Sequence, residues 1–91
     1  MSRDIDVSPI ELEKFIQTLQ HFQDQTDDRL RAVEESWSRC NESWKGEAKE
    51  SFTKGYEQTE SAVTQALDAG KDAVQWLQKF HDILQEMEEY R

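Results

Sequence analysis

The sequence predicts an all-α protein, a two-helix antiparallel hairpin that pairs with a second hairpin into a four-helix bundle. Two long segments repeat apolar residues at helical spacing, and Trp44-Lys45-Gly46 separates them near the midpoint of the 91-residue chain. The second segment is also apolar over a wider arc than one partner helix can cover. We therefore expect one domain over residues 1–91, with a helix at about 9–40, a turn at about 41–46 and a helix at about 47–89.

The first helix has a start signal in Ser8-Pro9-Ile10-Glu11. Ser8 suits the N-cap, Pro9 suits the first turn, and Glu11 stands at the third position of a capping box. Residues 1–7 before it are expected to form a frayed arm. The apolar row of this helix then runs through Leu12, Phe15, Leu19, Phe22, Thr26, Leu30, Val33 and Trp37.

The predicted corner is Trp44-Lys45-Gly46. Gly46 has no Cβ, so it can adopt a positive φ or let two backbones approach closely. Trp44 supplies a large rigid side chain that fixes how the second helix leaves the turn. Cys40 is the one cysteine, so it forms no internal disulfide. We interpret it as a free thiol without a role, with a disulfide between two copies as the alternative.

The second helix carries the strongest periodic signal, and its apolar row defines the predicted interface within and between hairpins. Four small residues in its middle third, Thr59, Ala66, Gly70 and Ala73, predict the place where two hairpins cross closely. A second row (Ala62, Ala69, Trp76, Ile83 and Tyr90) widens the face, and Leu67 and Val74 are expected on the opposite flank. The predicted interface residues are Phe52, Tyr56, Val63, Ala66, Gly70, Ala73, Leu77, Phe80, Leu84 and Met87.

With a Trp-x-Gly corner between two helices, the chain resembles the WXG-motif family, the small early secretory antigen-like proteins exported by type VII secretion systems. The resemblance covers essentially the whole chain. It implies a hairpin that pairs with another copy or with a related small helical protein, and recognition of the Trp44 and Gly46 end by an export ATPase. The family often carries a Tyr-x-x-x-Asp/Glu export element after its second helix. The one match here, Tyr56 to Glu60, lies inside the second helix and is interpreted as core, which leaves the signal to a partner.

Composition excludes several classes of function. A net charge of −9 without a basic run disfavours nucleic acid and anionic membranes as partners. No apolar stretch is long enough to span a bilayer, and the first thirty residues hold no signal-peptide core. The acidic residues are expected on solvated helix faces, with Asp27 and Arg31 placed four apart as a surface ion pair.

The sequence offers little for catalysis or for a cofactor. His21 and His81 stand far apart, and the Glu that a bundle di-iron site needs three residues before each His is missing. The three glycines are isolated, so no phosphate loop is formed. We therefore expect no enzyme activity, no metal and no cofactor.

The expected function is that of a small export substrate or export partner that leaves the cytoplasm without a cleaved signal peptide. Its partner is expected to be a second copy, with a related small helical protein as the alternative. Two other functions stay open: a cytoplasmic structural or adaptor coiled coil, and a chaperone-like partner of a larger toxin.

Overall fold

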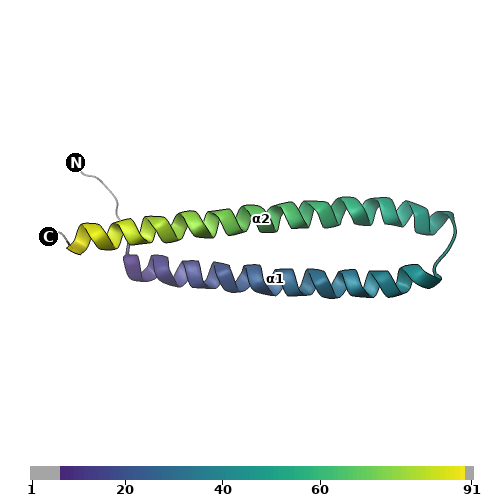
Figure 1. The fold of residues 1–91 in the computed structure, drawn as a ribbon, viewed down its shortest axis with the longest axis horizontal. Coiled ribbons are helices and arrows are strands. Elements are labelled where there is room, and N and C mark those ends of the chain that lie inside the picture. Colours follow the sequence, from purple (N-terminus) through teal and green to yellow (C-terminus); the bar gives the residue numbers. More distant parts are fainter. Residues whose placement is uncertain (1–6, 90–91) are drawn as a thin grey trace.

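The hairpin expected from the sequence is confirmed. A computed structural model describes residues 7–89, in which α1 (Pro9–Ser43) and α2 (Glu47–Glu89) run antiparallel side by side, with the C-terminal end of α2 extending beyond the start of α1 (Figure 1). Helices of 35 and 43 residues rise about 1.5 Å per residue, which accounts for a rod of 68 × 21 × 14 Å. Residues 1–6 of the expected arm and Tyr90 of the second row lie outside the described residues.

The start of α1 shows the serine half of the expected capping box. Ser8 is the N-cap, and its Oγ accepts a hydrogen bond of 3.3 Å from the backbone N–H of Glu11. Pro9 occupies the first helical position, where the missing N–H costs nothing. The Glu11 carboxylate lies 3.8 Å from Lys14 Nζ, one turn further along the helix.

The end of α1 lies three residues beyond the expected position, because Asn41, Glu42 and Ser43 stay helical. Their preference for turns is weak and is overcome by continued backbone hydrogen bonding. The last of these bonds joins the backbone N–H of Trp44 to the carbonyl oxygen of Cys40 at 3.1 Å. The connection is therefore only three residues, Trp44 to Gly46.

The core lies in the half of the hairpin distant from the turn, which we call the free-end half (residues 9–26 and 64–89). Leu12 and Ile16 of α1 pack there with Val74 and Leu84 of α2, and these four side chains are buried. Leu19, Leu77 and Phe80 cover this cluster and are half-buried. The remaining part, residues 27–63, is called the turn half.

Candidate interaction surface

The turn explains why glycine stands at position 46. Gly46 has a φ of +114°, a conformation that side chains with a Cβ rarely adopt. A Cβ at this position would meet nothing within 4 Å, so the glycine serves backbone conformation and not a close approach of the helices. The carbonyl oxygen of Gly46 accepts the first hydrogen bond of α2, from the backbone N–H of Glu50 at 3.2 Å.

Four aromatic rings close the hairpin next to this turn. Trp44 meets Trp37 edge to face at 6.2 Å between ring centroids and approaches Phe52 at 5.7 Å. Trp37 also lies 5.2 Å from both Phe52 and Tyr56 on α2. Such ring contacts stabilise by about 0.5–1.5 kcal/mol each beyond their buried area. Trp44 therefore joins the last turn of α1 to the first turns of α2.

The two helices meet along a middle row and an inner flank on each helix. The middle rows are Leu12, Leu19, Thr26, Leu30 and Trp37 on α1, and Tyr56, Val63, Gly70, Leu77 and Leu84 on α2; every member is buried or half-buried. The inner flanks hold Ile16, Gln23 and Glu34 on α1, and Glu60, Leu67, Val74 and His81 on α2, with the same burial. We call these four rows the seam.

A second apolar surface lies beside the seam and is exposed. Phe15, Phe22 and Val33 are rotated roughly a quarter turn from the seam of α1, and Thr59, Ala66 and Ala73 are rotated by a similar amount, in the same sense, from the seam of α2. Because the helices are antiparallel, rotation in the same sense brings both sets to one side of the hairpin. We call this side the apolar face; it consists of Phe15, Phe22, Val33, Phe52, Thr59, Ala66, Ala73, Trp76, Ile83 and Met87.

A comparison with known protein families identifies the chain. The family model described as proteins of 100 residues with WXG matches residues 4–89. The chain belongs to the WXG100 family. The family comprises small, non-enzymatic helical proteins associated with type VII secretion. No curated protein and no solved structure matches the chain.

The predicted interface of this WXG100 protein divides between the seam and the apolar face. Tyr56, Val63, Gly70, Leu77 and Leu84 lie in the seam, where they contact or face α1. Phe52, Ala66, Ala73 and Met87 lie on the apolar face, and Phe80 bridges the two by packing on the core while stacking on Trp76 at 5.5 Å.

Leu67 and Val74 lie on the flank opposite the second row, as expected, and this flank forms part of the seam. Both side chains are 6% exposed and point into the seam, among the most buried positions of the chain. The predicted interface does not include them, because the other members of their row, Glu60 and His81, are polar. In α1 the row of Ile16 was hidden in the same way by Gln23 and Glu34.

Gly70 has a different role from the one expected. A Cβ on Gly70 would overlap the side-chain amide of Gln23, so the glycine makes room for a residue of the same chain. Gln23 is 9% exposed, and its Oε1 has no hydrogen-bond partner within residues 7–89. Of the four small residues expected at a crossing of two hairpins, Thr59, Ala66 and Ala73 remain available on the apolar face.

A recess opens on the apolar face in the turn half. Its walls come from both helices, and the exposed thiol of Cys40 is part of its rim. The lining is mostly apolar or aromatic, with polar hydroxyl groups only on Ser36 and Tyr56. The recess is lined by Ala32, Val33, Ser36, Trp37, Cys40, Phe52 and Tyr56.

Two carboxyl groups face each other across the seam beneath the aromatic cluster. A hydrogen bond with Glu60, partial burial and the charge of Glu60 together raise the pKa of Glu34 above its ordinary value. Tyr56 donates a hydrogen bond of 3.4 Å to Oε2 of Glu60. Burial, then the charges of the two carboxylates, raises the pKa of Tyr56 as well. The literal Tyr-x-x-x-Glu match is thus part of the seam.

The remaining polar groups form surface contacts. The expected ion pair is present, with 2.9 Å between Arg31 Nη2 and Asp27 Oδ2. Within residues 7–89, no group of three His, Cys, Asp or Glu side chains could hold a metal ion. In the same part of the chain, neither helix is sufficiently long and apolar to cross a membrane.

Proposed function

We propose that two copies of this chain associate through their apolar faces into a four-helix bundle, and that this bundle is an exported protein or export partner of a type VII system. The observation that carries the proposal is the apolar face, which places side chains such as Trp76, 64% exposed, and Phe22, 59% exposed, in water. Exposed apolar surface of this extent marks an interaction site. Membership of the WXG100 family supports the link to type VII secretion.

The shape of the apolar face favours antiparallel pairing of the two hairpins. Its free-end half carries protruding rings at Phe15, Phe22 and Trp76, whereas its turn half contains the recess beside Cys40. A two-fold axis perpendicular to the rod brings each free-end half against the turn half of the other copy. The protruding rings of each copy then face the recess of the other. Parallel pairing would place rings against rings and leave both recesses empty.

The proposed recognition end is the turn, with Trp44 and Gly46. Trp44 is half-buried, so one part of its ring packs on Trp37 and Phe52 while another part stays accessible. By resemblance to the family, this end is offered to an export ATPase, and export needs no cleaved signal peptide. The proposed partners are therefore a second copy of the chain, at the apolar face, and the secretion machinery, at the turn.

Self-association is tested by light scattering and circular dichroism on the purified, reduced protein, with two neighbouring substitutions as a matched pair. Ala66→Glu puts a charge into the middle of the apolar face, whereas Gln65→Glu puts the same charge on the outer side of α2. We expect a helical dimer for the unmodified chain and for Gln65→Glu, and a monomer for Ala66→Glu. A monomeric, weakly helical unmodified chain would contradict self-pairing and direct the search to a related small helical partner.

Export is tested by following secretion and melting of Trp44→Ala and Trp44→Phe in cells with a type VII system. Trp44→Phe keeps an aromatic contact with Trp37 and Phe52, so we expect it to melt close to the unmodified protein. Lost export of a stable Trp44→Phe variant would support recognition at the turn. Unchanged export of both variants would contradict it, and absence of export of the unmodified chain would favour a cytoplasmic adaptor.

A further inference from the structure

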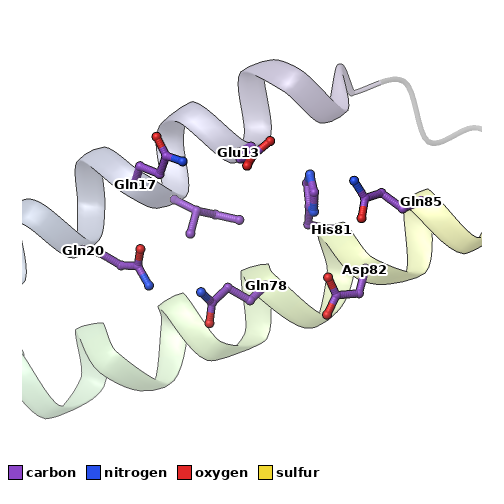
Figure 2. A pocket seen from close by; sticks show the side chains of 8 residues that line it. Glu13, Gln17, Gln20, Gln78, His81, Asp82 and Gln85 are labelled. Carbon is purple, nitrogen blue, oxygen red and sulfur yellow. The ribbon is translucent and has the colours of Figure 1, made fainter.

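The side of the hairpin opposite the apolar face carries a shallow groove lined by glutamines. Gln17 and Gln20 of α1 stand across the groove from Gln78 and Gln85 of α2 (Figure 2). The groove continues toward the turn as a second hollow that shares Gln20 and Gln78. Six of the nine glutamines of the chain line these two hollows: Gln17, Gln20, Gln23, Gln75, Gln78 and Gln85.

The lining combines an apolar floor with unpaired amides. Ile16 and Val74, both buried, lie at the base of the two hollows. No side-chain hydrogen bond within residues 7–89 involves any of the six amides. Gln23 is nine-tenths buried, and its Oε1 is left without a partner in the same part of the chain. Each of these amides can donate two hydrogen bonds and accept two.

The charges around the groove favour a basic ligand. Glu13 and Asp82 flank the first hollow and Asp24 flanks the second, whereas Lys71 is the one lysine or arginine among the lining residues. His81 lies between the two helices in the first hollow (Figure 2). The chain as a whole carries a net charge of −9, which attracts cationic segments from a distance.

We propose that this groove binds an extended, basic peptide segment of another protein. An extended backbone presents free N–H and C=O groups, which side-chain amides can pair with in both directions. A helix offers no such groups along its length because its backbone is satisfied internally. Basic side chains of the segment would lie toward Glu13, Asp24 and Asp82.

The groove does not depend on the proposed pairing of two hairpins. Gln17 and Gln20 are rotated from the seam in the sense opposite to Phe15 and Phe22, so a copy on the apolar face leaves the groove open. A single exported bundle would then present two such grooves on its outer sides.

The experiment titrates the full chain into short fluorescein-labelled peptides and follows fluorescence anisotropy. The probe alternates Lys and Thr, which favours an extended chain; one control alternates Glu and Thr, and a second is a helix-forming Lys and Ala peptide of equal length and charge. We expect the extended basic peptide to bind, the acidic peptide not to bind, and the helical basic peptide to bind at least about tenfold more weakly. No binding of the extended basic peptide would overturn the proposal, as would equal binding of the helical one.

A matched pair of double variants separates the groove from net charge. Gln17→Lys with Gln78→Lys places two positive charges in the groove, and Gln25→Lys with Gln65→Lys places the same charges on outer helix surfaces. We expect the groove pair to weaken binding at least about tenfold and the outer pair to weaken it much less. Equal weakening by both pairs would overturn the proposal.

Folding and association are measured on the same samples. Circular dichroism checks that each variant is helical, and light scattering reports whether the hairpins pair. Gln17→Ala with Gln78→Ala, which keeps good helix formers at both positions, replaces the lysine pair if that pair unfolds. Loss of pairing without loss of peptide binding would concern only the proposed function.

Discussion

The seam and the apolar face hold the same kinds of atoms but use different side chains. The buried apolar positions of the seam are aliphatic (Leu12, Ile16, Leu67, Val74 and Leu84), whereas the apolar face collects Phe15, Phe22, Phe52 and Trp76. Four large aromatic side chains are therefore left exposed, while Trp37, Trp44, Tyr56 and Phe80 are half-buried. A hairpin optimised to stand alone would place more of its aromatic rings inside, so this distribution supports the proposed association through the apolar face.

This division links the stability of the fold to association. The seam buries its side chains incompletely, because no described side chain is completely withdrawn from solvent. A partner that binds only the folded hairpin adds to its stability by mass action. We therefore expect the melting temperature to rise with protein concentration.

The largest expected effect comes from Leu84→Ala, at a seam position that is 8% exposed and packs on the core cluster. Loss of a buried leucine side chain typically costs about 2–5 kcal/mol of unfolding free energy. The incomplete burial of the seam argues for the lower half of that range. The free energy of unfolding, measured by urea denaturation at fixed protein concentration, checks this value.

The neighbouring Ile83→Ala serves as the control for this substitution. Ile83 is 52% exposed on the apolar face, so its removal leaves the seam intact. We expect Ile83→Ala to weaken pairing in light scattering while leaving most of the hairpin stability in place at low concentration. Similar losses of hairpin stability for both variants would break the distinction between seam and face.

Gly46→Ala is expected to lower stability by about 1–3 kcal/mol, because alanine is strained at a φ of +114°. Unlike the previous pair, this change at the turn should affect folding and pairing together. Thermal melts beside Lys45→Ala, an exposed neighbour in the same turn, provide the measurement. Equal melting temperatures for the two variants would show that another backbone geometry can close the hairpin.

The two helical glycines of α2 compare seam and surface with the same substitution. A Cβ on Gly55 would meet nothing within 4 Å, so Gly55→Ala should stabilise by about 0.5–1 kcal/mol. Gly70→Ala should gain less, because the new methyl group displaces the amide of Gln23. In a Gln23→Ala background, Gly70→Ala should stabilise as much as Gly55→Ala does. A double-mutant cycle of melting measurements tests this expectation. Additive effects would contradict the packing of Gln23 on Gly70.

The fold could be predicted from the sequence because its signals are local. Ser8 caps α1 through its own side chain, and the positive φ at the corner requires Gly46. The middle rows of the seam were also predicted, since Leu12, Leu19, Val63 and the residues in register with them repeat every seven positions.

The inner flanks could not be predicted, because a row repeating every seven residues has neighbouring rows on both sides. Periodicity alone does not say which neighbour faces the other helix. The sequence favours the more apolar neighbouring row as the one that faces the other helix. The structure instead buries the row with Gln23 and Glu34 on α1 and the row with Glu60 on α2. The proposed association would explain why the more apolar flank of each helix does not face inward.

The smallest expected effect is a dependence of stability on pH, which arises where the seam holds polar groups. Glu34 faces Glu60 and Tyr56 of α2, with Arg31 and Asp27 nearby on its own helix. Because the pKa of Glu34 is raised above 4.5, the folded state binds this proton more tightly than the unfolded chain does. The stabilisation is therefore present at acidic pH and is lost as the pH rises from 4.5 through the raised pKa.

Melting temperatures between pH 4.5 and neutral pH test this expectation when two variants with the same change in charge are compared. Glu34→Gln removes the titrating group of the seam, whereas Glu57→Gln removes an exposed carboxylate on α2. We expect the unmodified chain and Glu57→Gln to lose stability as the pH rises, and Glu34→Gln to lose less. The general repulsion of a chain with a net charge of −9 changes equally in both variants, so the difference between them isolates the seam. If both variants keep the full slope, the two carboxyl groups titrate independently, and the polar part of the seam is only a gap in its apolar packing.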